Sequence, residues 1–301
     1  MDINQLNEHF GLPGVLVFRA TASGLIYAEI TTPHATATVY LQGAHLTAWQ
    51  PAGHKPVIFT SRKAEFVSGK AIRGGVPISF PWFATRHDGK TGPSHGFARI
   101  QDWTLVFAAL AGDDLHLSFT LGPNDLSRGL GFDHFRLAYQ LTIGRSLTMQ
   151  LTVANDAATP LLFEEALHTY YAVADISKIA ITGLEGVSYL DKVENLQSKQ
   201  QGDIAITGPT DRVYLNTTET CALNDSEGKR RIAVAKTGSN TTVVWNPWEV
   251  GAAKLADMDP NEWRKFVAIE TVNAGVDAIT LASGASHTMQ AKVTVDEFSA
   301  E

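Results

Sequence analysis

The sequence has a single cysteine, Cys221, among its 301 residues. One cysteine cannot form a disulfide within the chain, which favours a reducing compartment. No basic residue stands beside it in TETCALND, so we expect a buried structural side chain rather than a nucleophile. The first residues, MDINQLNEHFG, lack the basic and apolar segments of a signal peptide, and no apolar run is long enough to span a bilayer. These absences predict a cytoplasmic protein with no membrane partner.

Positive charge is also scarce. Lys and Arg number 24 against 31 acidic residues, and the formal net charge is -7. Because phosphate backbones are neutralised by a basic face, this balance predicts no nucleic-acid partner. The HExxH, CxxC, GxGxxG and GxxxxGK[ST] patterns are missing as well, so the sequence predicts no metal site and no dinucleotide or nucleotide cofactor.

Helical periodicity is limited to residues 3–10 and 252–258. Strict alternation of apolar and polar residues dominates instead, as in residues 115–121, 137–143, 147–153 and 289–295. Without a strand-then-helix rhythm, a doubly wound sheet or a TIM barrel is disfavoured, and the sequence predicts an all-β antiparallel sandwich with few short helices. No linker, low-complexity segment or internal repeat marks a boundary, so we expect a single domain over residues 1–301.

The most informative segment runs from residue 73 to 103 and reads RGGVPISFPWF, ATRHDGKT and GPSHGFARIQDW. It places the arginines Arg73 and Arg99 in turn-forming, aromatic sequence, and a guanidinium suits a carboxylate, a phosphate or neighbouring hydroxyls. Three glycines would let the backbone approach a ligand closely: Gly74, Gly75 and Gly96. The segment is typical of a binding site; the alternative is a pair of packed loops whose arginines make surface ion pairs.

Five sequence blocks resemble one family in order and spacing. They are the RGGVP, PWF and HGFAR segment, EALHTYYAV around His168, PTDRVY around Asp211, VVWNPW at 243–248 and FVAIETVNA around Glu270. Together they resemble the D-hexose-6-phosphate mutarotases, the glucose-6-phosphate 1-epimerase branch of the aldose 1-epimerase superfamily. The resemblance implies a galactose-mutarotase-like supersandwich that binds its ligand on the concave face of a broad sheet.

Interconverting the anomers of a sugar needs one base for the C1 hydroxyl and one acid for the ring oxygen. Glu270 is the candidate base, because in FVAIETV it shares a strand face with Phe266, Ala268 and Val272, where desolvation would raise its proton affinity. The alternative is an edge-strand glutamate paired with an arginine.

His168 is the candidate acid, since histidine titrates near neutral pH. Beside Leu167 and two tyrosines, however, a hydrogen-bonded core histidine is an alternative. The resemblance implies that His168 is the general acid and Glu270 the general base.

Three further residues are candidate sugar ligands. The resemblance makes Asp211 a ligand of substrate hydroxyls, whereas its PTDR context also fits an Asx turn. For His95 we expect either a role in shaping the sugar site or a structural role. Ser94 stands where relatives commonly carry glutamine or another residue, so we expect its shorter side chain to reach a ligand through water.

The resemblance also implies that Arg73 and Arg99 hold the anionic end of the substrate, with three nearby basic residues available to assist: Lys70, Arg86 and Lys90. Four aromatic residues are candidates either for stacking on a pyranose or for packing: Trp82, Phe83, Trp245 and Trp248.

These inferences predict a monomeric hexose-6-phosphate mutarotase that needs no cofactor and takes a small sugar phosphate. One alternative is an aldose 1-epimerase for free sugars, and another is a noncatalytic carbohydrate-binding module. A glycosidase would use two carboxylates, for which Glu164 and Glu165 are the candidates.

Overall fold

A computed structural model describes residues 1–298 of the chain. One layer is an eight-stranded antiparallel sheet, here called the outer sheet, with strand order β13-β17-β18-β22-β9-β8-β7-β6. The strands are β6 (Thr104–Ala111), β7 (Asp114–Leu121), β8 (Phe135–Ile143), β9 (Leu147–Asn155), β13 (Ile179–Thr182), β17 (Cys221–Asp225), β18 (Arg230–Thr237) and β22 (Ser286–Glu297). The four stretches of strict alternation all lie in this sheet, in β7, β8, β9 and β22, which confirms that prediction.

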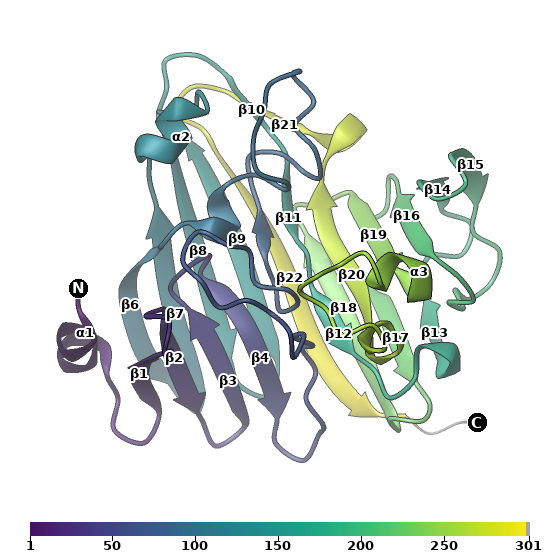
Figure 1. Ribbon diagram of the computed structural model, residues 1–301, viewed down its shortest axis with the longest axis horizontal. Coiled ribbons are helices and arrows are strands. Elements are labelled where there is room, and N and C mark those ends of the chain that lie inside the picture. Colours follow the sequence, from purple (N-terminus) through teal and green to yellow (C-terminus); the bar gives the residue numbers. More distant parts are fainter. Residues whose placement is uncertain (299–301) are drawn as a thin grey trace.

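A second layer lies in front of the outer sheet (Figure 1). It contains a four-stranded sheet, β1 to β4, and an eight-stranded sheet, here called the inner sheet, of order β15-β14-β16-β19-β20-β11-β5 with β12 also paired to β20. The strands are β1 (Leu16–Ala20), β2 (Ile26–Thr31), β3 (Ala35–Tyr40), β4 (His45–Pro51), β5 (Ile78–Ser79), β11 (Glu165–Leu167), β12 (Tyr170–Ala172), β14 (Ser188–Asp191), β15 (Leu196–Lys199), β16 (Thr210–Tyr214), β19 (Thr241–Asn246) and β20 (Phe266–Asn273). A bridge from Leu46 to Val76 links the two sheets of this layer. A short pair, β10 (Leu161–Phe163) and β21 (Ile279–Leu281), completes the strands of the described residues.

Helices are few and short: α1 (Ile3–Phe10), α2 (Asp125–Gly129) and α3 (Trp248–Ala252), with 3-10 turns η1 (Ala98–Ile100), η2 (Ile176–Lys178), η3 (Glu262–Lys265) and η4 (Gly275–Asp277). None of those in residues 1–298 has the length and apolar character to cross a bilayer. The predicted helix at residues 3–10 is confirmed, and Asp2 caps it by accepting the Gln5 N–H. The helix predicted at 252–258 is wrong in position, because Asn246 accepts the N–H of Trp248 and fixes an earlier start.

The hydrophobic core fills the space between the two layers. Buried side chains of the outer sheet, such as Leu117, Tyr139 and Leu151, belong to one cluster with Trp49 and Ile269 of the front layer. Cys221 is also buried in this cluster, as predicted. The all-β sandwich is confirmed; a single domain over residues 1–301 stays a prediction.

The alternation of side chains along β20 determines which of them point away from the core between the layers. Asn273 contacts His287 and Met289 of the outer sheet, so the odd-numbered positions of β20 face that sheet. The even-numbered positions, including Glu270, face away from it. On this free face, strand register aligns Val243 beside Glu270 and Asp211 beside Trp245. The free face of β16, β19 and β20 is therefore where a site can form.

Candidate active site

A cavity of about 370 Å³ opens on the free face of the inner sheet. A volume of this order suits a small ligand. All seven residues predicted for the site line it: Arg73, Ser94, His95, Arg99, His168, Asp211 and Glu270. The fold thus brings together residues from three loops, the 3-10 turn η1 and two strands that are up to about two hundred positions apart in sequence.

Glu270 lies on a central strand, β20, which pairs with β19 on one side and with β11 and β12 on the other. The alternative of an edge-strand glutamate is therefore wrong. The residue is 2% exposed. Burial raises the pKa of Glu270 well above its usual value, the nearby Asp211 carboxylate raises it further, and Arg99 opposes the shift. A carboxylate with raised proton affinity is what a general base needs.

His168 lies between β11 and β12, directly across from Glu270. Leu167 pairs with Thr271 and Tyr170 pairs with Ala268, so the same register sets His168 opposite Glu270. The imidazole Nε2 is 3.3 Å from the Glu270 Oε1. The ring of His168 stacks on that of Tyr170, with centroids 4.9 Å apart and planes at 14°. Strand register and an aromatic stack therefore fix the histidine against the carboxylate.

The surroundings favour the uncharged imidazole. Burial lowers the pKa of His168 well below its usual value, and His95, Arg99 and Arg73 lower it further. Within residues 1–298, His168 Nδ1 and Glu270 Oε2 are buried atoms without a hydrogen-bond partner. A core histidine normally has its ring nitrogens hydrogen-bonded, which His168 Nδ1 is not within these residues.

Asp211 lies within strand β16 rather than in a turn, so the alternative of an Asx turn is wrong. It pairs with Trp245 and lines the cavity two strands away from Glu270. Burial raises the pKa of Asp211, while Lys192 lowers it and Asp191 raises it. A carboxylate at the cavity wall can accept hydrogen bonds from two neighbouring hydroxyls.

The two arginines supply the positive charge of the cavity. Arg73 donates from Nε to Asp257 Oδ1 over 3.1 Å and from Nη1 to the Tyr170 hydroxyl over 3.2 Å. Arg99 donates from Nη2 to the Ser94 carbonyl over 2.6 Å, and its Nε is buried without a partner in the described residues. Burial lowers the pKa of Arg99 to about 10, so the guanidinium stays charged at neutral pH.

His95 and Ser94 form the loop that faces His168. His95 adopts a positive φ of 60°, and its Nδ1 accepts the N–H of Ala84 over 3.3 Å. Its ring lies edge-on to Phe83 and to His168, at centroid distances of 4.9 and 5.4 Å. Burial lowers the pKa of His95 to about 3, with Arg99 and Arg73 contributing. The ring is therefore neutral at neutral pH and forms part of the cavity wall beside His168.

The glycines of this segment were expected to let the backbone approach a ligand, but they lie close to other backbone segments of the protein instead. A Cβ on Gly96 would lie 2.0 Å from the Phe80 carbonyl oxygen, and one on Gly74 would lie 2.5 Å from that of Phe59. Both have positive φ angles. These glycines are required because two backbone segments must lie close together to support the arginine loops.

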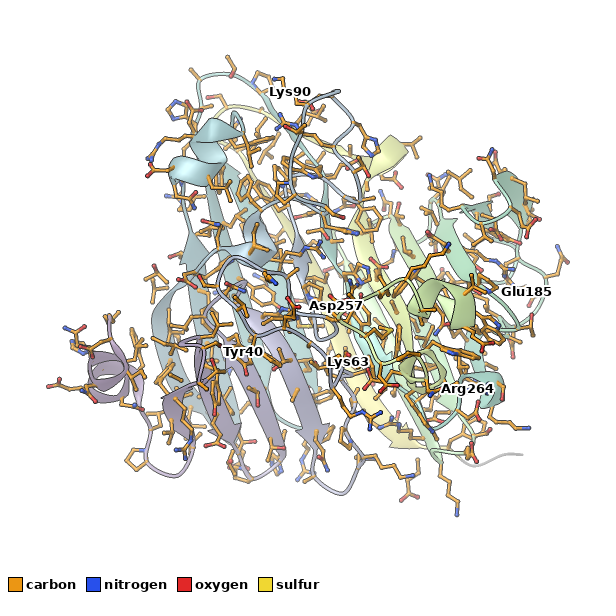
Figure 2. All side chains as sticks on the ribbon, viewed as in Figure 1. Tyr40, Lys63, Lys90, Glu185, Asp257 and Arg264 are labelled. Carbon is orange, nitrogen blue, oxygen red and sulfur yellow. The ribbon has the colours of Figure 1, made fainter. Side chains whose placement is uncertain are left out.

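The cavity lining includes some of the aromatic candidates and none of the three additional basic candidates. Phe83 and Trp245 line the cavity, whereas Trp82 packs against Phe97 and Trp248 against Trp263. The three extra basic residues do not line it. Lys70 pairs with Glu65, and Arg86 and Lys90 pair with Asp88. Lys90 lies at the top edge of the molecule in Figure 2, away from the centre.

The two glutamates considered for a glycosidase have structural partners. Glu164 accepts the N–H groups of Phe83 and Gly275, each over 2.8 Å. Glu165 accepts from Asn273 over 2.9 Å and lies 3.2 Å from His287. Neither lines the cavity, so the pair of carboxylates that a glycosidase needs is not formed by them.

Two residues that contact Arg73 were not predicted. Tyr170 lines the cavity and stood in a quoted block without a role. Asp257 does not line the cavity and lies in a loop whose sequence carries no signal for binding. No group of three or more His, Cys, Asp or Glu residues suited to a metal ion occurs among residues 1–298.

The chain was compared with known proteins. Residues 28–294 match the family model described as "Aldose 1-epimerase". The chain belongs to the aldose 1-epimerase family. A protein from Escherichia coli named "Putative glucose-6-phosphate 1-epimerase" is 35% identical over 80% of this chain and 81% of its own length.

Solved structures agree with this family assignment. The crystal structure of "a putative mutarotase (YeaD)" from Salmonella typhimurium has 29% identity, covers 98% of this chain and 99% of its own, and gives a TM-score of 0.88. A galactose mutarotase-like protein from Clostridium acetobutylicum, at 13% identity and a TM-score of 0.69 over 94% and 98% of the two chains, shares the fold. The predicted resemblance is thus confirmed, and the chain is an epimerase with a galactose-mutarotase-like fold.

Proposed function

We propose that this epimerase interconverts the α and β anomers of a hexose 6-phosphate, with Glu270 and His168 as the base and acid and Arg73 and Arg99 as the phosphate ligands. The observation that carries the proposal is one cavity in which a buried His–Glu contact of 3.3 Å and two arginines occur together. We also propose, from the sequence, a cytoplasmic monomer of one domain.

The His168–Glu270 pair can perform ring opening without a net gain or loss of protons, because it takes one proton from the sugar and gives one back. Glu270 takes the proton of the C1 hydroxyl while protonated His168 gives its proton to the ring oxygen, and the C1–O5 bond breaks to leave the aldehyde. Rotation about C1–C2 exchanges the faces of the aldehyde. On reclosure His168 regains its proton from O5 and Glu270 returns one to O1. O1 and O5 are bonded to the same carbon, so an acid and a base that lie side by side can reach both oxygens.

The shifted proton affinities support this cycle. The imidazolium and carboxylate become a neutral imidazole and a carboxylic acid when the ring opens. Burial lowers the pKa of His168 and raises that of Glu270, so both shifts favour the state that ring opening forms. Both shifts move proton affinity from the histidine to the glutamate, which is the direction of proton movement in ring opening.

The phosphate assignment rests on charge. Arg99 is half-buried and charged, with its buried Nε unpaired in the described residues, and Arg73 has N–H groups left over from its two contacts. Half-buried guanidinium groups with free donors are suited to an anionic group. The Escherichia coli relative is named for glucose 6-phosphate, which agrees with this assignment.

The test is the rate of anomer exchange of glucose 6-phosphate and of plain glucose, measured by exchange NMR with the wild type, Glu270→Gln and Arg99→Ala. We expect acceleration of the phosphorylated sugar, its loss in Glu270→Gln, and a drop of about ten- to a hundred-fold in kcat/KM in Arg99→Ala, because a hydrogen bond to a charged group is lost.

Other outcomes identify the alternatives. Equal acceleration of both sugars that persists in Arg99→Ala would indicate an aldose 1-epimerase for free sugars. Binding without acceleration of either sugar would indicate a carbohydrate-binding module and contradict the acid–base assignment.

A further inference from the structure

Arg73 is held from two sides by residues distant in sequence. Asp257 accepts its Nε–H over 3.1 Å, and the hydroxyl of Tyr170 accepts from Nη1 over 3.2 Å. Asp257 belongs to the loop between α3 and η3, which passes in front of the inner sheet and lies near the middle of the molecule in Figure 2. Leu255 of the same loop lines the cavity. The loop therefore contributes both a wall of the cavity and an anchor for the arginine.

Two contacts on different nitrogens fix the plane of a guanidinium. An arginine has five N–H donors in a rigid fork, and these contacts use two of them. The rest have no acceptor among residues 1–298. Both side chains of the Arg73–Asp257 pair are 24% exposed, so solvent screens the pair only partly. The free donors of Arg73 are thus held in one orientation before a ligand binds.

Tyr170 connects this arginine to the acid. Its hydroxyl contacts Arg73 and its ring face stacks on His168 at 4.9 Å. An aromatic ring is rigid, so it sets the separation between the anion-binding guanidinium and the histidine. In a sugar phosphate, that separation corresponds to the distance from the phosphate to the ring oxygen.

We propose that Asp257 and Tyr170 are positioning residues that orient Arg73 and set its distance from His168, so that the site selects a sugar whose phosphate stands at that distance from the ring oxygen. This inference rests on the proposed function. Asp257 acts by aligning the arginine, and Tyr170 acts as a spacer.

The first experiment compares Asp257→Ala and Asp257→Asn, with Asp259→Ala as the matched control. Asp259 lies on the same loop as Asp257 and pairs with Arg62 over 3.6 Å. Asp259 and Arg62 do not line the cavity. For Asp257→Ala we expect KM for glucose 6-phosphate to rise about ten-fold or more, with kcat falling less than about three-fold, because one charge-assisted contact of Arg73 is lost. Asparagine keeps an acceptor oxygen, so Asp257→Asn should stay within about three-fold of the wild type.

The second variant, Tyr170→Phe, keeps the ring and its stack on His168 but removes the hydroxyl. We expect KM for glucose 6-phosphate to rise several-fold with kcat nearly retained. A mere structural role would instead lower the rates with both sugars alike, and thermal melting of each variant identifies loss of folding.

Two results would overturn the inference. One is an Asp257→Ala enzyme whose KM is unchanged or lower, since that would make Asp257 a competitor of the phosphate. The other is a Tyr170→Phe enzyme with an unchanged KM. If the wild type itself shows no preference for glucose 6-phosphate over glucose, both the proposed function and this inference fail. If the wild type shows that preference and both variants keep it, the inference is contradicted and the proposed function stands.

Discussion

Residues 1–298 contain two histidine–glutamate pairs, each with a buried carboxylate, and they differ in the sign of the histidine pKa shift. His168 lies 3.3 Å from Glu270, and His287 lies 3.2 Å from Glu165. The Glu165 contact raises the pKa of His287, whereas burial, His95 and the arginines lower that of His168. The same two residue types at the same distance therefore behave differently because their neighbours differ.

The two pairs also face different sides of the inner sheet. Glu270 faces the cavity, while Glu165 faces the outer sheet, where Asn273 donates to it and His287 also contacts the Gly238 carbonyl. In the second pair the histidine bridges two sheets. The His168–Glu270 pair has open space and competing charges around it, and these are the grounds on which we propose it for proton transfer.

The largest expected effect separates the two glutamates. Glu270→Gln should lower kcat for anomer exchange by about a hundred- to ten-thousand-fold, because an amide cannot take a proton. Glu165→Gln should retain activity within about three-fold and lower the melting temperature instead, because it changes a buried link between sheets. Steady-state rates and thermal melts of both variants check this. A folded Glu165→Gln enzyme as inactive as Glu270→Gln would remove the distinction.

A smaller effect concerns the pH profile of the active pair. The Arg99 cation lowers the pKa values of both His168 and Glu270. Replacing it in Arg99→Gln should raise both, so the bell-shaped profile of kcat should move to higher pH, by about 0.5 to 1 pH unit, which is on the order of the interaction with one nearby charge. Measuring kcat at saturating glucose 6-phosphate from pH 5 to 9 tests this. An unmoved profile would show that Arg99 does not influence the pair.

The smallest effect concerns the stability of the structural pair. Because the folded pKa of His287 is raised, its stabilising contribution is complete below about pH 6.5, the unfolded value, and is lost as pH rises through the folded pKa. The wild type should therefore lose about 1 to 3 °C more in melting temperature between pH 6 and pH 8.5 than His287→Gln does. Equal losses in both proteins would contradict this sign.

Much of the fold follows from local sequence. Alternation in residues 115–121 and 147–153 predicts β7 and β9 because side chains on a strand alternate between a core and an outer face. The helix at 252–258 is misplaced because its start depends on Asn246, whose side chain also donates to the carbonyls of Trp263 and Phe266. That contact is made across the fold, and no local pattern contains it.

The candidate site was also largely predicted, and what was missed has a physical cause. The seven residues were found because the family blocks name them. Asp257 was missed since its role comes from a contact with Arg73, a residue 184 positions away. Asp211 and Glu270 had plausible alternative roles that only the pairing of β16, β19 and β20 excludes.

The sequence by itself determined the residue types, the strand periodicity and the family blocks, because these are local properties of the chain. The tertiary structure decided that His168 stands across from Glu270, that Arg73 contacts Asp257 and Tyr170, and that Glu165 and His287 are turned away from the cavity. The reason is that strand order and register are set by non-local pairing. A period of two says that a side chain faces one side of a sheet, but only the packed layers say which side holds the cavity.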